Sequence, residues 1–243
     1  MKKLGTVIYY ECATSFKYIW IFYAIVLGVI TAISALVFII TGTTENVGTN
    51  ALEVNSMVYA GILGALGFKE DFKMLIQNGF TRKYIFLATA SLFAFISGIL
   101  ALMDTIIGKV MQLIFKNYFT IFSGIYGRGH SLFINWLWLF LVYMLICCLV
   151  YLIVLIINKI GKTASIAAGA ILGVAAAVAV PFLFRFLLPD SLTDTLIDYL
   201  IKGAGFMGDG SINFIYPFLI LFCSIGILSF FASQVIQKTE LKI

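Results

Sequence analysis

The sequence predicts an all-α, polytopic membrane protein: six transmembrane helices, an interfacial N-terminal helix and short amphipathic helices outside the membrane. Of its 243 residues, 62% are hydrophobic and only 11% are charged, which is more apolar surface than a soluble fold of this size can cover. Long apolar runs recur along the chain, and about 20 such residues cross a bilayer core roughly 30 Å thick. Strict alternation of apolar and polar residues is absent, which disfavours a transmembrane β-barrel.

The N-terminal segment, residues 1–17, has the pattern of a helix lying along the membrane surface. Leu4, Val7 and Ile8 begin an apolar stripe at helical spacing, and Tyr9 lies beside it. Aromatic side chains favour the headgroup level of a bilayer, so we expect an interfacial helix here. The alternative is a disordered tail.

Six apolar stretches follow, and we expect each to cross the membrane as a helix within a single transmembrane domain, residues 1–243. The second is short and carries Gly61, Gly64 and Gly67, which allow another helix to approach closely. The expected spans are residues 18–40, 52–68, 84–103, 132–157, 164–188 and 212–235.

Two further polar segments lie between spans. Residues 104–131 carry an apolar and a polar stripe, which fits either an extension of the third helix or a separate helix on the outer surface. Residues 191–202 follow Pro189 and show amphipathic helical spacing. Ser191 is the expected N-cap of that helix, because a serine side chain accepts a hydrogen bond from the first turn.

The distribution of basic residues predicts that both termini are cytoplasmic. An even number of spans places the termini on one side, and short cytoplasmic loops are enriched in Lys and Arg. With the termini inside, eleven of the 16 basic residues are cytoplasmic: Lys2, Lys3, Lys17, Lys69, Lys73, Arg82, Lys83, Lys159, Lys162, Lys238 and Lys242. The net charge of +5 is explained by this topology, and no basic run interleaved with aromatics indicates nucleic-acid binding.

The charged connector between the second and third spans predicts a short amphipathic helix over about residues 69–80. Its apolar side chains fall on one helical face: Phe72, Leu75, Ile76 and Phe80. Glu70 and Asp71 suit the positive end of the helix dipole, Gly79 can end the helix, and Thr81 can cap the next one. The segment is either a docking surface for a soluble partner or an ordinary basic loop at the membrane surface.

The residues that could carry catalysis or bind a metal are sparse. Gly161-Lys162-Thr163 resembles the end of a phosphate-binding loop, but the glycine required five positions earlier is Ile156. His130 is the only histidine, and the four cysteines have no zinc-site spacing. We therefore expect no catalytic residue, no metal site and no cofactor in this chain. A membrane-embedded enzyme acting on lipids is disfavoured for the same reason.

Three charged residues fall near the outer ends of expected spans: Glu53, Asp104 and Arg185. Charge within a bilayer is costly and often functional. These residues either mark a gate or cargo path, or extend their charges to the outer surface.

The connector also resembles a known loop. Glu70-Asp71-Phe72-Lys73, followed by Gln77 to Lys83, is similar to the loop after span two in small six-span permeases of type-2 ABC exporters from low-GC Gram-positive bacteria. In those permeases the loop forms the coupling helix that meets the ATPase. The resemblance implies that the coupling residues here are Glu70, Asp71, Phe72, Lys73, Gln77, Asn78 and Arg82.

The resemblance further implies a permease subunit in the bacterial cell membrane. It would pair with a second permease copy, as a homodimer or heterodimer, and recruit separate ATPase subunits that bind ATP and Mg. The chain resembles exporters of phenol-soluble modulins and of lantibiotic-type peptides, so the expected cargo is an amphipathic peptide or a similar hydrophobic molecule. The alternative is a non-transporting scaffold or sensor subunit that docks a soluble protein through the same loop.

Overall fold

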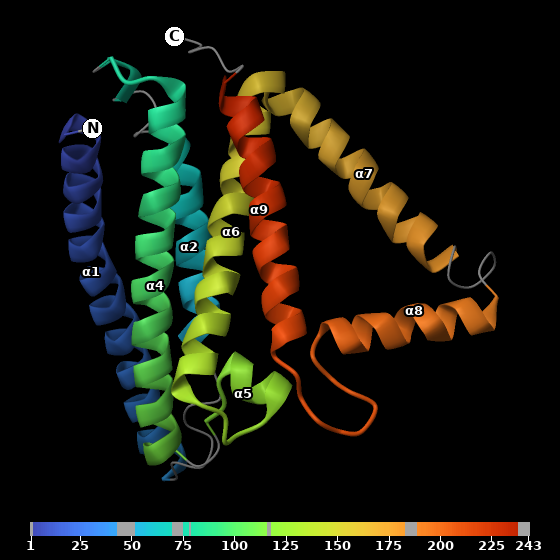
Figure 1. Ribbon diagram of the computed structural model, residues 1–243. Helices are drawn as coiled ribbons and strands as arrows, with labels where there is room; N and C mark the ends of the chain where they lie inside the picture. The colour runs from blue at the N-terminus through green and yellow to red at the C-terminus, as the bar shows by residue number, and fades with distance from the viewer. Residues whose placement is uncertain are drawn as a thin grey trace. The chain divides into compact units, whose positions relative to one another are not determined.

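Helices make up nearly all of the chain that the structure describes (Figure 1). The structure is a computed structural model and describes residues 2–42, 52–69, 75–77, 79–115, 118–182 and 189–237. The only β pairing in those residues is an isolated bridge between Phe206 and Ile212. The helices are α1 (Lys2–Thr41), α2 (Leu52–Lys69), α4 (Arg82–Ile114), α5 (Ile121–Tyr126), α6 (Leu132–Ile160), α7 (Lys162–Phe182), α8 (Asp190–Gly203) and α9 (Ile215–Gln237).

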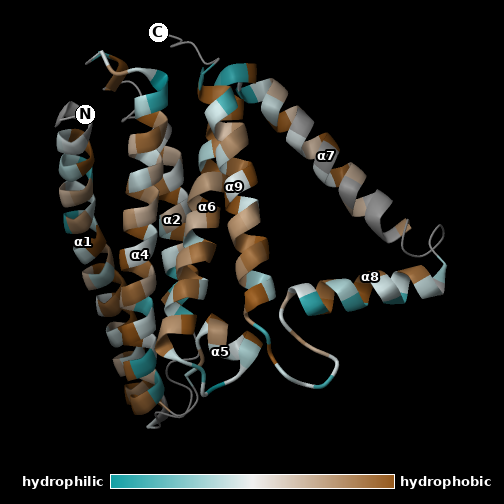
Figure 2. Ribbon diagram, viewed as in Figure 1, coloured by the Kyte–Doolittle hydropathy of each residue, from teal (hydrophilic) through white to brown (hydrophobic). Residues whose placement is uncertain are grey.

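Four of these helices, α1, α4, α6 and α9, are long and apolar enough to cross a membrane. Figure 2 shows hydrophobic colour along much of their length, whereas hydrophobic and hydrophilic residues alternate along α8. Three of the expected spans, residues 18–40, 84–103 and 132–157, lie within α1, α4 and α6, and α9 covers the span expected at 212–235 from Ile215 onward. The other two expected spans correspond to α2 and α7, whose apolar stretches are shorter, Leu52–Gly67 and Lys162–Ala175. The all-helical class is confirmed, while the six-span count stays a prediction.

The N-terminal region does not form a helix separate from the first span. α1 is continuous over 40 residues, or roughly 60 Å at 1.5 Å per residue. This is about twice the thickness of a bilayer core, so part of α1 must lie outside the hydrocarbon. The structure is helical from Lys2 onward, while the interfacial position of residues 1–17 and the start of the first span near residue 18 stay predictions. Residues 17 and 18 are Lys and Tyr, neither of which breaks a helix.

The contacts divide the chain into two compact units, residues 1–151 and 152–243. In unit 1, α4 contacts both α1 and α2, and Figure 1 shows α1, α2 and α4 side by side. One stripe of α4 is buried at helical spacing, as a core-facing helix requires: Ile85, Ala88, Thr89, Leu92, Phe93, Ile96, Ser97, Leu100, Ala101, Asp104, Thr105 and Gly108. α4 extends unbroken to Ile114, so the first part of segment 104–131 is an extension of the third helix.

The glycines of α2 permit the close helix contacts that the sequence predicted. A Cβ added at Gly64 would lie only 2.7 Å from the backbone oxygen of Cys147 in α6. A Cβ at Gly67 would lie 3.1 Å from the ring of Phe93 in α4. α2 therefore lies close to α6 at Gly64 and close to α4 at Gly67.

In unit 2, Gly161 separates α6 from α7 at a φ of +102°. The predicted turn is therefore confirmed at Gly161 alone, because α6 runs to Ile160 and Lys162 and Thr163 already belong to α7. α8 then begins at Asp190 with Pro189 as its N-cap and no side-chain cap hydrogen bond. The expectation that Ser191 caps this helix is wrong, because the amides of Leu192 and Thr193 bond to the carbonyl of Pro189 and Ser191 already lies inside the first turn.

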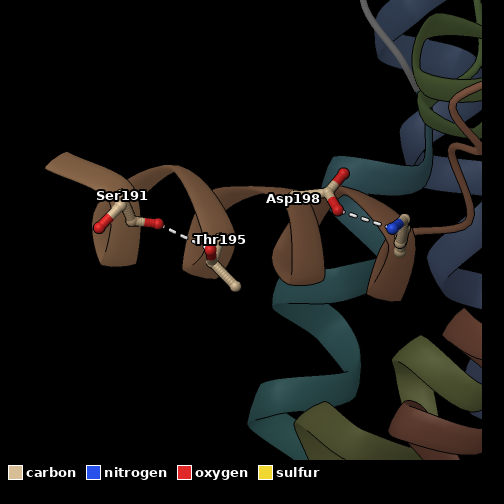
Figure 3. A network of polar contacts seen from close by, with 4 residues as sticks. Ser191, Thr195 and Asp198 are labelled. Carbon is tan, nitrogen blue, oxygen red and sulfur yellow. Dashed lines mark hydrogen bonds and ion pairs between the residues drawn. The ribbon is translucent and has the colours of Figure 1, made fainter.

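Polar side chains of α8 form contacts along the helix (Figure 3). The Thr195 hydroxyl donates to the backbone oxygen of Ser191 at 2.7 Å, and Lys202 pairs with Asp198 at 2.6 Å. The large apolar residues of the same helix are also exposed: Leu192, Leu196, Ile197, Leu200 and Ile201. Such a helix, apolar on one side and charged on the other, fits a membrane–water interface.

Candidate functional site: a buried carboxyl–tyrosine cluster

A polar cluster lies inside unit 1, where an apolar core is expected. It contains Tyr23 of α1, Glu53 and Ser56 of α2, Asp104 of α4 and Tyr143 of α6, and we call it the carboxyl–tyrosine cluster. All five residues are buried, with exposed fractions of 0–2%. Four helices thus each contribute at least one polar side chain to one part of the core.

Asp104 is the centre of the cluster. The Tyr23 hydroxyl donates to Oδ1 of Asp104 at 2.8 Å, and the Tyr143 hydroxyl donates to Oδ2 at 2.5 Å. Each carboxyl oxygen therefore has a donor, which is the condition for burying such a group at tolerable cost. The two tyrosines come from different helices, so Asp104 links α4 to both α1 and α6.

The Tyr23 hydroxyl has a choice of acceptors. Besides Asp104, it lies 3.1 Å from the backbone oxygen of Leu100. It also lies 3.5 Å from Oγ of Ser56, and in that pair either hydroxyl can be the donor. A phenol has only one proton to donate, so it can satisfy one acceptor at a time. The shorter distance to Asp104 favours the carboxyl oxygen in this conformation.

Glu53 lies at the start of α2, and its two carboxyl oxygens have different surroundings. Its Oε2 accepts the backbone amide of Ile121, the first residue of α5, at 2.7 Å. A reciprocal capping box between Thr120 and Ser123 fixes the first turn of α5 and so positions that amide. The other oxygen, Oε1, is buried and has no hydrogen-bond partner within the described residues. A buried polar atom without a partner costs about 1–3 kcal/mol, which marks Glu53 as a candidate functional residue.

The loop before α5 also holds the start of α2. The amide of Leu52 donates to the Tyr118 hydroxyl at 3.3 Å. Burial raises the pKa of the Tyr118 hydroxyl. Together with the Glu53–Ile121 bond, this contact joins α2 to the segment that follows α4.

Two of the three predicted gate residues are thus brought into one buried region. Glu53 and Asp104 are each 1% exposed, so neither extends its charge to the surface in this structure. Arg185, the third, lies outside the described residues. Sequence reasoning did not identify Tyr23, Ser56 or Tyr143. A tyrosine within an apolar run was the only available signal, and spans commonly contain such residues.

The predicted coupling residues lie in the connector between α2 and α4. Most of them lie outside the described residues: Glu70, Asp71, Phe72, Lys73 and Asn78. Residues 75–77 are helical, with Gln77 exposed. Gly79 adopts a φ of +78°, and the amides of Gly79 and Phe80 bond to the carbonyls of Ile76 and Leu75. This pair of bonds is the Schellman motif that ends helices, so the predicted helix stop at Gly79 is confirmed.

α4 begins immediately after this stop. Thr81 is at the N-cap position as predicted, although its side chain makes no cap hydrogen bond. Arg82 is the first residue of α4 and is partly buried. The connector therefore passes into α4 within three residues of Gly79.

Comparisons of this chain with protein-family models, with curated proteins and with solved structures found no match.

Proposed function

We propose that this chain is the transmembrane permease subunit of an ATP-driven type-2 ABC exporter that moves amphipathic or antimicrobial-type peptides, or similar hydrophobic cargo, out of the cell. A separate ATPase subunit provides the energy, with ATP and Mg bound there. The permease pairs with a second permease copy in the bacterial cell membrane and keeps both termini cytoplasmic across six spans.

The observation that carries the proposal is the continuity of α4. It runs without a break from Arg82, beside the connector, to Asp104 at the centre of the carboxyl–tyrosine cluster. These two residues are 22 positions apart, or about 33 Å along a helix. A force applied by an ATPase to the connector is thereby transmitted along one stiff helix to the place where α1 and α6 are hydrogen-bonded to α4.

The cluster then acts as a gate between helices. Moving α4 relative to α1 and α6 breaks the bonds from Tyr23 and Tyr143 to Asp104, and hydrogen bonds to charged groups are each worth about 1.5–3 kcal/mol. The helices consequently favour discrete packed arrangements over gradual sliding. Glu53 has a gate role in the same proposal, since it joins α2 to α5.

The test is ATPase activity in nanodiscs containing this chain and its ATPase, with and without an amphipathic helical peptide. Glu70→Ala combined with Arg82→Ala removes one acid and one base from the connector. The matched control, Asp194→Ala combined with Lys202→Ala, does the same on α8. We expect peptide stimulation to fall at least tenfold in the connector variant, about 1.4 kcal/mol of coupling, and to be kept in the control.

Two results would contradict the proposal. Unchanged complex formation and turnover in the connector variant would reduce the connector to an ordinary loop. A complex that forms normally but never responds to peptide would favour the scaffold or sensor alternative.

A further inference from the structure

The short helix α5 and the residues just before it contact three other helices of unit 1. We call residues 118–126 the α5 strap. On α4, a Cβ added at Gly108 would lie only 2.8 Å from the methyl carbon of Thr120, the N-cap of α5. On α6, the rings of Phe122 and Trp138 meet edge to face with their centroids 5.8 Å apart. The third attachment, to α2, is a single hydrogen bond to a carboxyl group.

That carboxyl group belongs to Glu53, which holds the strap through one of its two oxygens. Oε2 accepts the amide of Ile121 at 2.7 Å, whereas Oε1 is buried and has no hydrogen-bond partner within the described residues. Asp104, the other carboxyl of the cluster, accepts a phenol hydroxyl at each oxygen. The two buried carboxyls therefore differ in how many donors they have.

The surroundings of Glu53 supply no positive charge within the described residues. The ionisable groups that face it are one carboxyl and three phenols: Asp104 on α4, Tyr23 on α1, Tyr143 on α6 and Tyr118 in the strap. α5 itself, Ile121–Tyr126, has no charged residue. The guanidinium of Arg128, just after the strap, bonds to the carbonyl of Tyr118. No described Lys, Arg or His forms an ion pair with Glu53.

This arrangement disfavours a negative charge on Glu53. An ionised Glu53 would be a buried anion with one donor, close to a second carboxyl. Burying an unpaired charge costs far more than burying an unpaired neutral hydroxyl, and two neighbouring carboxyls resist ionising together. Asp104, with a donor at each oxygen, is the better place for the charge. The hydrogen-bond pattern therefore favours a proton on Oε1 of Glu53.

We propose that the Glu53 carboxyl is a proton-controlled latch for the α5 strap. While the strap is docked, Oε1 carries a proton and Oε2 accepts the Ile121 amide. Oε1 is closed off from solvent in this state, so its proton leaves only when the strap separates from α2. The proton then passes to water, and Glu53 remains as a hydrated carboxylate. This latch does not depend on the proposed transport function.

The sign of the pH effect follows from where the proton is bound. Above about pH 5 a hydrated glutamate is ionised, so the docked strap holds one proton more than the released strap. Raising the pH therefore favours release, by up to about tenfold per pH unit. Lowering the pH favours docking.

Hydrogen exchange of the full chain in nanodiscs tests the latch. Protection factors, which are corrected for the intrinsic pH dependence of exchange, should fall by up to about tenfold in the strap between about pH 5.5 and pH 6.5. Peptides from α6 and α9 should show no such change. Glu53→Gln keeps a neutral group and an oxygen for the Ile121 amide, so its strap should stay protected at both pH values. Two results would overturn the latch: protection that is independent of pH in the unaltered protein, or the same fall with pH in Glu53→Gln.

Infrared spectroscopy then locates the proton. At about pH 6 hydrated carboxyls are ionised, so the carbonyl stretch of a protonated carboxyl reports only buried acids. We expect this band in the unaltered protein. It should lose intensity in Glu53→Gln and keep its intensity in Asp104→Asn, which makes the matched change at the other carboxyl of the cluster. Absence of the band from the unaltered protein, or an unchanged band in Glu53→Gln, would overturn the proposal.

Discussion

Gly64 allows a quantitative test of the contact between α2 and α6. In Gly64→Ala, the new Cβ would lie 2.7 Å from the backbone oxygen of Cys147 and 3.1 Å from its Cα. Both are backbone atoms, so the conflict cannot be relieved by rotating a side chain and the helices must separate. Overpacking of this kind costs about 1–3 kcal/mol, while the higher helix propensity of alanine offsets about 1 kcal/mol. The expected net effect is a loss of about 0–2 kcal/mol in the free energy of unfolding.

Gly61, one helical turn earlier, is the matched control. A Cβ there would lie 3.7 Å from a methyl of Val150 and 3.8 Å from a methyl of Ile146, which are ordinary van der Waals distances. Gly61→Ala gains the same helix propensity without the clash. Its free energy of unfolding should therefore exceed that of the unaltered protein by up to about 1 kcal/mol. The propensity term cancels between the two variants, and Gly64→Ala should be about 1–3 kcal/mol less stable than Gly61→Ala.

The measurement is reversible unfolding of each purified variant by SDS titration in mixed micelles, followed by circular dichroism. If Gly64→Ala and Gly61→Ala have the same free energy of unfolding, α2 and α6 do not lie as close together as the structure places them. A lower stability in both variants would also refute the reasoning, because only one position has backbone atoms at clashing distance.

Three further predictions concern other parts of the chain. Tyr143→Phe removes the donor to Oδ2 of Asp104 and should lower the free energy of unfolding by about 1–3 kcal/mol, measured by the same SDS titration. Gly79→Ala puts a side chain at a φ of +78° and should destabilise the connector by about 1–2 kcal/mol, which hydrogen exchange at that helix end would detect. Ser211 donates a hydroxyl and an amide hydrogen bond to Asp209, and these bonds hold the pKa of Asp209 below its usual value of 3.8. The stabilisation from this carboxylate is therefore present above pH 3.8 and is lost as the pH falls through the lowered pKa. Ser211→Ala should move that pKa back upward in a ¹³C NMR titration.

Hydropathy and periodicity were sufficient to predict the helical class and the positions of the main helices. The expected spans 84–103 and 132–157 lie within α4 and α6, since long apolar runs give a strong signal. The ends of helices were predicted less well. The start of α8 was placed at Ser191 from its side-chain chemistry, whereas the Pro189 carbonyl accepts the first bonds.

The local sequence could not predict that α1 is one continuous helix. An interfacial helix and a transmembrane helix share the same 3.6-residue spacing, and no glycine or proline lies between residues 6 and 27 to separate them. The third helix posed the same difficulty, because the charge of Asp104 suggested the end of a span. In the structure Asp104 accepts hydrogen bonds from tyrosines of two other helices, and α4 continues past it to Ile114.

The carboxyl–tyrosine cluster shows which part of a site the sequence can and cannot predict. Glu53 and Asp104 were identified because charge near an apolar run is unusual. Their environment was not predictable, since Tyr23 is 81 positions and Tyr143 39 positions from Asp104. Only the packing of four helices brings these residues together.

The arrangement of α4 constrains how any movement of this protein can occur. The helix begins at the connector, packs against α1 and α2 and carries the carboxyl group that both tyrosines contact. A displacement of α4 that separates Asp104 from Tyr23 and Tyr143 would leave a buried carboxyl without donors, which is far more costly than losing an apolar contact. A second stable position of α4 must therefore supply Asp104 with new donors or with water. Under the proposed function, the outward-open state is the one in which water reaches Asp104, and opening the transport path and hydrating this carboxyl are the same event.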